Sequence, residues 1–186
     1  MIGFAITGSF CTISQSLDVM KSLVLNGYEV LPIISENAYT TDTRFGNSKD
    51  IIEEIEKICQ RPIIHTIIDA EPLGPKTKLD AMLICPCTGN TLSKLANGIT
   101  DTSVTMAAKA HLRNDKPLVI SLASNDALSA NLKNIATLLS RKNVYFTPML
   151  QDDPINKPHS LVTDFSLVES ALKNAIKGKQ MHKIFL

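Results

Sequence analysis

Two short segments of small polar residues follow apolar runs, and both have the residue types of an anion-binding turn. Pro86-Cys87-Thr88-Gly89-Asn90-Thr91 follows the apolar run 81–85 and opens a helical stretch that ends at Asn97-Gly98. Thr7-Gly8-Ser9-Phe10-Cys11-Thr12 follows the apolar run 2–6 in the same way. The unpaired N–H groups and the positive dipole end at the start of a helix suit a phosphate or a carboxylate. Together the two segments predict an anion or nucleotide site.

The same residues have simpler interpretations, which stay open at this point. Thr88 and its neighbours could form an ordinary helix N-cap, and Gly8-Ser9 could form a tight turn. Arg44 lies in a polar, hydroxyl-rich segment, 35–46, that is longer than a plain connection requires. A lone arginine is usually solvated, yet its guanidinium fits a carboxylate through two parallel hydrogen bonds. Arg44 is therefore a candidate contact for a carboxylate ligand.

The elements that must position these residues follow from hydrophobic patterning. Apolar runs alternate with helical patterns, which is typical of a parallel sheet with helices on both faces. The expected strands are 2–6, 28–34, 63–68, 81–85, 118–122 and 144–146. The first expected helix ends at Gly27, and the second spans 51–58 with Ser48 as its N-cap. A third helix opens at the turn 86–91 and ends at Asn97-Gly98. The remaining expected helices are 102–112, 127–139 and 167–176. Residues 71–75 and 151–160 are expected to be irregular.

The expected fold is a single α/β domain over residues 1–186, a three-layer α/β/α Rossmann-like sandwich with a mainly parallel sheet. Open parallel sheets bind ligands beyond the carboxyl ends of their strands. The turns at 7–12, 35–45, 86–91 and 121–126 should therefore meet at one edge. Each of them is rich in Ser, Thr, Asn or Gly.

Composition narrows the function classes. The chain has 186 residues, 44% of them hydrophobic, and a formal net charge of +1. No basic block or interleaved aromatic series indicates nucleic-acid binding. No apolar run is long enough for a transmembrane helix, and the first residues do not have the pattern of a signal peptide. We expect a cytoplasmic protein that binds neither nucleic acid nor membranes.

We expect structural roles, rather than metal binding or catalysis, for most of the cysteines and histidines. Cys59 and Cys85 are expected in the core, and their spacing to Cys11 and Cys87 fits no usual zinc site, so no metal is expected. Cys11 and Cys87 lie in the two turns, where a helix N-terminus can lower a thiol pKa, but a reactive role is the less favoured interpretation. His65 is interpreted as a packed imidazole. Of the residues at 109–113, Lys109 and Arg113 are expected on a surface or a subunit contact, and His111 in solvent.

The stretch from Pro86 to Asp101 resembles the signature of the flavoprotein family, which includes flavin-containing cysteine decarboxylases and flavin prenyltransferases. That signature reads roughly Pro-x-Ser-x-Asn-Thr and then Lys-x-x-x-Gly-x-x-Asp, and the second part corresponds to Lys94 through Asp101 here. A finer resemblance, to a branch that works with a second subunit, is carried by further segments, namely 8–12, 37–39, 41–46, 70–75, 87–91, 107–114 and 151–154.

The resemblance implies an oxidoreductase subunit that converts dihydrodipicolinate to dipicolinate with its partner subunit, in the mother cell of a sporulating bacterium. It implies FMN as the family cofactor, NADP on the partner subunit, and homo-oligomers built on trimers. Asn90 and Arg44 become candidate contacts for the dicarboxylate substrate. The turns and the resemblance together give the expected cofactor contacts, which are Gly8, Ser9, Ser35, Asn37, Pro86, Thr88, Gly89, Asn90, Thr91 and Ser121. No catalytic residue stands out.

Two departures from the family pattern keep other functions open. The decarboxylases place a catalytic histidine after the first-strand turn, whereas this chain has no histidine before His65. They also carry Pro-Ala-Met-Asn where this chain has Ser124-Asn125-Asp126-Ala127. The alternatives are an FMN-dependent lyase or transferase of the same family, and a non-catalytic scaffold that retains an anion pocket.

Overall fold

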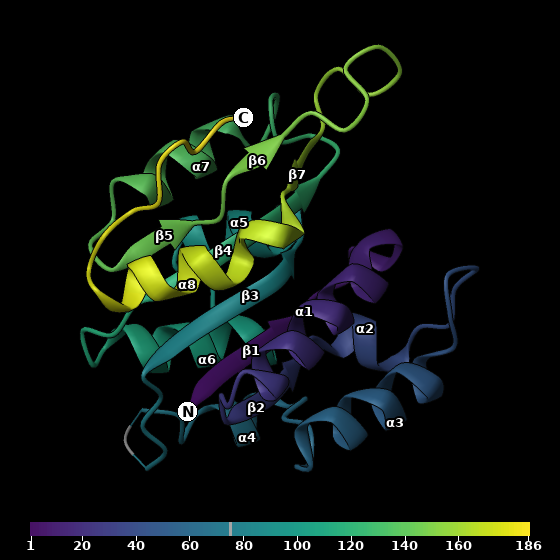
Figure 1. The fold of residues 1–186 in the computed structure, drawn as a ribbon, viewed down its shortest axis with the longest axis vertical. Helices are drawn as coiled ribbons and strands as arrows, with labels where there is room; N and C mark the ends of the chain where they lie inside the picture. Colours follow the sequence, from purple (N-terminus) through teal and green to yellow (C-terminus); the bar gives the residue numbers. More distant parts are fainter. Residues whose placement is uncertain (75) are drawn as a thin grey trace.

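A parallel sheet runs through the centre of the molecule (Figure 1), in a computed structural model that describes residues 1–74 and 76–186. Its parallel strands lie in the order β2-β1-β3-β4-β5. Their bounds are β1 Ile2–Ile6, β2 Val30–Ile34, β3 Ala81–Cys87, β4 Leu118–Ser124 and β5 Val144–Phe146. Parallel pairing brings the carboxyl ends of these strands to one edge of the sheet, as the alternating sequence pattern predicts.

A short antiparallel pair extends this edge beyond the parallel strands. The two strands are β6 Met149–Leu150 and β7 Leu161–Thr163, and β7 pairs with the end of β4 through Ala123 and Val162. The first half of β4 instead pairs with β5, so β4 changes partner along its length. Residues 151–160, which we call the arm, extend from β6 and β7 away from the body of the molecule (Figure 1). The arm is irregular, as predicted, whereas β6 and β7 were not expected.

Helices cover both faces of the sheet and give the expected three layers. The helices packed in the core of the first face are α1 Ile13–Leu25, α3 Ser48–Cys59 and α8 Val168–Ile176. The helices packed in the core of the second face are α4 Ile67–Ala70, α5 Gly89–Ala96, α6 Ser103–Leu112 and α7 Leu132–Leu139. A further helix, α2 Glu36–Thr40, follows β2. Within residues 1–74 and 76–186, none of the helices combines the length and apolar character needed to cross a bilayer.

The strand β3 shows how the sequence divides its side chains between these cores. Leu83 and Cys85 pack in the core that contains α1, and Met82 and Ile84 pack in the core that contains α5. This alternation is the normal consequence of strand geometry. The pairing register of β3 with β4 shifts between Ile84 and Cys87, and Cys87 then lies on the α5 side. The strand therefore ends with its last residue turned into the core beneath the predicted ligand-binding turn.

The prediction of a strand at 63–68 is wrong. Ile64 forms only an isolated parallel bridge with Ile33, and the chain then turns into α4. Thr66 caps this helix by accepting a hydrogen bond from the Asp69 N–H. This local hydrogen bond ends the extended segment at Thr66 and starts a helix. The apolar residues of 63–68, on which the strand prediction was based, do not reveal such a bond. Pro75, part of the predicted break at 71–75, lies outside the described residues.

Two predicted helix starts are also wrong. The helix expected over 127–139 begins at Leu132, because the preceding residues form turns around Asp126. Asn47, not Ser48, is the N-cap of α3, and its side chain accepts from the Lys49 N–H. Ser48 instead donates both its N–H and its hydroxyl to the Asp42 carboxylate. The predicted loop 35–46 contains α2.

Candidate functional site

The four predicted turns meet at the carboxyl edge of the sheet and line one cleft. Its volume is about 860 Å³, within the range of small-molecule sites. The lining residues from the first two turns are Gly8, Ser9, Phe10, Cys11, Thr12, Arg44 and Phe45. The lining residues from the other turns, β7 and the arm are Thr88, Gly89, Asn90, Ala123, Ser124, Asn125, Asp126, Asp152, Lys157, Ser160 and Val162. The central expectation, that the turns after β1 and β3 lie together, is confirmed.

A buried threonine joins these two turns. The Thr7 hydroxyl donates to the Pro86 carbonyl at 2.8 Å and accepts from the Thr88 N–H at 2.9 Å. The Thr7 N–H also donates to the Pro86 carbonyl, at 3.2 Å. Thr7 is 1% exposed, so these bonds are shielded from water. The hydroxyl holds the end of β1 and the start of the β3 turn in one fixed relation.

The turn after β3 is closed as a helix N-cap. The Thr88 side chain accepts from the Thr91 N–H at 3.2 Å, and the two hydroxyls are 3.1 Å apart. The N–H groups of Gly89 and Asn90 take no part in the hydrogen bonds found among the described residues. Asn90 is exposed at the cleft wall. The N-cap interpretation is therefore confirmed, and anion binding by the two remaining N–H groups stays a prediction.

Gly89 is required by a close approach between α5 and the loop after β4. A Cβ at this position would lie 2.5 Å from Ser124 Oγ, 2.6 Å from Asn131 Nδ2 and 2.7 Å from Asp126 Oδ1. The carboxylate of Asp126 accepts from Ser124 Oγ at 2.5 Å and from Asn131 Nδ2 at 2.9 Å. The Ser124 hydroxyl, aided by Asn131, holds the pKa of Asp126 below its ordinary value. An ionised carboxylate thus lies against the first turn of α5.

The turn after β1 presents hydroxyls and an exposed thiol. Thr12 Oγ1 donates to the Ser9 carbonyl at 2.9 Å and lies 3.1 Å from Ser9 Oγ. The chain then passes through a short 3-10 turn, Phe10–Thr12, into α1. Cys11 is exposed in this turn and lines the cleft. A Cβ at Gly8 would come no closer than 3.5 Å to its nearest neighbour, Phe10, so space alone does not demand glycine there.

Two cationic side chains line the cleft. Arg44 is exposed in the turn Thr43–Gly46, with its guanidinium 4.8 Å from the ring centroid of Phe45. Lys157 reaches the cleft from the arm and forms an ion pair with Asp152 at 2.9 Å. This exposed pair contributes little to stability. Arg44 is therefore the cleft cation whose charge no carboxylate within 4 Å offsets among the residues described here.

Several expected cofactor contacts do not line the cleft. Ser35 is buried at the start of α2, and its N–H donates to the Ile6 carbonyl at 2.9 Å. Asn37 is exposed on α2, and Thr91 is buried behind Thr88. The Ser121 hydroxyl is buried and bonded to Thr147 at 2.9 Å. Pro86 supplies only its carbonyl, to Thr7. Four of these five residues are therefore buried outside the cleft lining, and Asn37 is exposed outside it.

Sequence reasoning missed the residues that the arm and β7 bring to the cleft. Asp152, Lys157 and Ser160 line it, although the sequence of 151–160 indicated only irregular structure. A polar segment with an acid and a base placed directly after a buried strand was the signal that could have found them. Asp126 attracted attention only as a departure from the family pattern.

Three of the four cysteines are buried, and burial decides their chemistry. Loss of hydration raises the pKa of Cys59 and of Cys85 to about 12 and also raises the pKa of Cys87. The prediction that Cys59 and Cys85 are core residues is confirmed. Cys87 is also a core residue, although its sequence position suggested the turn. Only Cys11 is exposed.

The predictions for His111 and His65 differ in how well they match the structure. The prediction of a solvated His111 is wrong, because the ring is 1% exposed and its Nε2 lies 2.9 Å from the Pro117 carbonyl. Since a carbonyl only accepts, Nε2 carries the proton in this bond. Burial lowers the pKa of His111. His65 is packed as expected, stacked on Tyr39 with ring centroids 4.0 Å apart. Lys109 is exposed on α6, and Arg113 is exposed at the C-cap of that helix.

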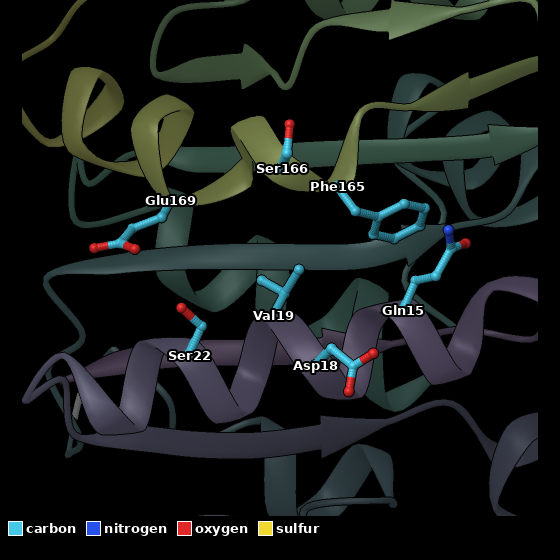
Figure 2. A pocket seen from close by; sticks show the side chains of 7 residues that line it. All are labelled: Gln15, Asp18, Val19, Ser22, Phe165, Ser166 and Glu169. Carbon is cyan, nitrogen blue, oxygen red and sulfur yellow. The ribbon is translucent and has the colours of Figure 1, made fainter.

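A second hollow, of about 340 Å³, lies between α1 and α8 (Figure 2). Its acidic side chains have local partners, since Glu169 bonds to Lys173 at 2.7 Å and Asp18 lies 3.7 Å from Lys21. Figure 2 shows Ser166 pointing away from α1, so it does not converge with the others. Nothing in this hollow gathers polar groups around one point, and the cleft at the sheet edge is the candidate site.

The fold and the cleft define the class of protein. The chain belongs to the flavoprotein family, whose profile matches residues 1–168. It is 43% identical over 185 residues to the B subunit of dipicolinate synthase from Bacillus subtilis (strain 168), a match that covers all of this chain and 92% of that protein. The crystal structure of the corresponding B subunit from Bacillus halodurans C superposes with a TM-score of 0.91 at 44% identity, over 100% of this chain and 95% of that one.

A more distant relative comes from another branch of the family. Flavin prenyltransferase UbiX of Thermoplasma acidophilum is 30% identical over 124 residues, which are 67% of each protein. The likeness to the Bacillus proteins extends over the whole chain, whereas this one covers part of it. The resemblance carried by the segment from Pro86 to Asp101 is thereby confirmed at the level of the family.

Proposed function

We propose that this chain is the B subunit of a dipicolinate synthase and works with the A subunit of that enzyme to convert dihydrodipicolinate to dipicolinate during sporulation. The observation that carries the proposal is the 43% identity over 185 residues to the B. subtilis protein. The cleft at the sheet edge supports it, because a dicarboxylate needs donors and a cation there. Asn90 and Arg44, which line the cleft, are the proposed substrate contacts.

The cleft also fits FMN, which we propose as the cofactor that this family member can hold. The Ser9 hydroxyl, near the start of α1, suits a phosphate, and Phe10, Ala123 and Val162 give the cleft an apolar wall for a ring system. When bound, FMN would supply a two-electron acceptor. The proposed direct contacts are the predicted residues that line the cleft, namely Gly8, Ser9, Thr88, Gly89 and Asn90. The other members of the predicted set do not line it and are not proposed as direct contacts, namely Ser35, Asn37, Pro86, Thr91 and Ser121.

The reaction removes a hydride and a proton from the ring. We propose that oxidised NADP on the partner subunit, in place of FMN in this cleft, takes the hydride and that the proton passes to solvent. The site is then completed by that second protein. We further propose that the chain assembles as homo-oligomers built on trimers and works in the cytoplasm of the mother cell. The exposed Lys109 on α6 and Arg113 at the C-cap of that helix are available for such contacts.

The proposal is tested by assaying the two subunits separately and together. We expect dipicolinate formation, measured by ultraviolet absorbance with dihydrodipicolinate generated in the cuvette, only when both proteins are present. Omitting FMN and NADP in turn identifies the hydrogen acceptor. Full activity of the partner without this chain would reject a catalytic share for it.

A scaffold that keeps only an anion pocket is distinguished by Asn90→Ala. This change removes a cleft side chain while leaving the capping bonds of Thr88 intact. Asn97→Ala, at the other end of the same helix, is the matched control because, among the residues that the structure describes, the Asn97 side chain bonds only to the Ser93 carbonyl. If the two-subunit complex forms and retains full activity with Asn90→Ala, the cleft has no chemical role.

A second candidate is an FMN-dependent lyase or transferase, favoured by the fit of the cleft to FMN and by the likeness to the flavin prenyltransferase. The described residues that line the cleft include no histidine, so the proton-transfer group of the decarboxylase branch has no counterpart there. Turnover of a cysteinyl or prenyl substrate by this chain without a partner, with bound FMN visible in its absorbance spectrum, would favour this candidate.

A further inference from the structure

Lys157 carries one of the two cations of the cleft, and hydrogen bonds of the arm hold its backbone in place. Its N–H donates to the Asp153 carbonyl at 2.8 Å, and its carbonyl accepts from the Ser160 N–H at 3.0 Å. The arm is also tied to the loop after β4, because the Leu128 N–H donates to the His159 carbonyl at 2.9 Å. The side chain of Lys157 therefore extends toward the cleft from a defined point.

The partner of this cation is a weakly bound carboxylate. Lys157 Nζ donates to Asp152 Oδ2 at 2.9 Å, and the two side chains are 55% and 34% exposed. The ammonium holds the pKa of Asp152 below its ordinary value, and the carboxylate holds the pKa of Lys157 above its own. Both groups are therefore charged at neutral pH, but water screens an exposed pair of this kind. Another carboxylate can replace Asp152 at little cost.

The two cations approach the turn after β1 from different sides. Arg44 lies in the segment that follows β2, and β2 pairs with β1 along one edge of that strand. Lys157 comes from the arm, which returns through β7 to the end of β4, on the other side of β1 (Figure 1). A negative charge on Cys11, in the turn after β1, adds to the rise in the pKa of Lys157, so the ammonium lies near that turn. The Ser9 hydroxyl of the same turn also lines the cleft.

The other charges at the cleft leave both cations accessible to a ligand. Among the described residues that line it, the charged side chains are Arg44, Lys157, Asp126 and Asp152. The carboxylate of Asp126 accepts from side chains of its own loop, and in the described part of the chain it lies within 4 Å of neither cation. A dianionic ligand that contacts both cations therefore competes with Asp152 alone of the lining carboxylates.

We propose that Lys157 binds one carboxylate of the dicarboxylate ligand while Arg44 binds the other. The inference rests on the proposed function and deepens it, because it names the contact of the second carboxylate. The carboxylates of dihydrodipicolinate and of dipicolinate flank the ring nitrogen and diverge from it, so they reach two cations on either side of one turn. The ligand replaces Asp152 as the partner of Lys157. The arm thereby selects dicarboxylates over monocarboxylates.

The first test is the KM of the two-subunit enzyme for dihydrodipicolinate. Lys157→Gln keeps a polar side chain but removes the charge. We expect KM to rise about tenfold with little change in kcat, because the lost contact is made equally to the bound substrate and to the transition state. Lys142→Gln is the matched control, since Lys142 forms an exposed pair with Asp115 at 3.0 Å and does not line the cleft. We expect this control to keep the KM of the unaltered enzyme.

Asp152→Asn distinguishes ligand binding from a structural role of the ion pair. Both Asp152→Asn and Lys157→Gln break the pair, so a pair that only shapes the arm predicts the same change in KM for both. A lysine that binds the ligand predicts opposite changes. Because Asp152→Asn removes a weak competitor, we expect it to lower KM about twofold to threefold.

The second test compares inhibition by dipicolinate with inhibition by picolinate, which has a single carboxylate. We expect dipicolinate to inhibit the unaltered enzyme about tenfold more strongly, since it contacts both cations. Lys157→Gln should remove this advantage and leave inhibition by picolinate within about twofold, because the single carboxylate binds Arg44. The comparison on the unaltered enzyme needs no substitution, so it stands even if a variant folds poorly.

The outcomes separate the inference from the proposed function. If the two subunits make dipicolinate but Lys157→Gln leaves KM unchanged, or Asp152→Asn does not lower it, the role of Lys157 is wrong and the proposed function stands. Equal inhibition of the unaltered enzyme by the two probes contradicts the inference in the same way. If the two subunits make no dipicolinate, the proposed function is wrong, and the inference is wrong with it.

Discussion

Gly89→Ala is expected to destabilise the protein by pushing α5 away from the loop after β4. The added methyl group would lie 2.5 to 2.7 Å from atoms of Ser124, Asn131 and Asp126, well inside van der Waals contact. Overpacking of this kind costs roughly 1–3 kcal/mol, and each hydrogen bond lost from the network adds about 1 kcal/mol. The better helix propensity of alanine returns less than about 1 kcal/mol.

These terms give a loss of about 2–3 kcal/mol in the free energy of unfolding. For a chain of this size, that loss lowers the melting temperature by roughly 5–10 °C. Urea unfolding, followed by circular dichroism, measures the free energy directly, because the midpoint falls while the slope stays constant.

Gly8→Ala is the matched control for this experiment. A methyl group at Gly8 would meet only the Phe10 ring, at 3.5 Å, which is ordinary contact. We therefore expect its stability to stay within about 0.5 kcal/mol of the unaltered protein. Equal stabilities of the two variants would refute the reasoning, because they would show that the loop after β4 does not approach α5 as closely as described.

Three further predictions concern buried groups. Thr7→Val should cost about 1–3 kcal/mol because it leaves the Thr88 N–H without its acceptor, and Thr7→Ser should cost much less; urea titration compares them. A thiol reagent should modify only Cys11 in the native protein and all four cysteines in the denatured protein. If a second cysteine of the native protein reacts as fast as Cys11, the burial of Cys59, Cys85 or Cys87 is contradicted. Burial lowers the pKa of His111 below its unfolded value of 6.5, so the unfolded chain binds more protons and stability falls as the pH drops below about 6.5. His111→Gln should flatten this fall in urea titrations at about pH 5 and about pH 8.

The sheet and its ligand-binding edge were predictable because they depend on strong, repeated patterns. Buried parallel strands are continuous apolar runs, and 2–6 and 118–122 were found from that property alone. The turns that follow them are recognisable by small polar residues. Connectivity then places all of these turns at one edge, so the cleft was predicted without any long-range information.

The wrongly predicted helix starts and the wrongly predicted strand at 63–68 have a different cause, which is local hydrogen bonding. Thr66 and Asn47 decide where helices begin by capping them, and neither is distinguished by hydropathy. The start of α7 is delayed by the network around Asp126, which joins residues on both sides of the turn. β6 and β7 are too short for a periodic pattern to reveal, so the arm and its cleft residues were missed.

The cleft draws its wall from residues scattered between Gly8 and Val162, in a chain of 186 residues. Translation delivers these segments in order, and β7, which pairs with the end of β4, leaves the ribosome after the other strands of the sheet. A nascent or truncated chain that stops before β7 lacks one side of the pocket. Ligand capture in the complete cleft can therefore begin only after the chain has been made through β7.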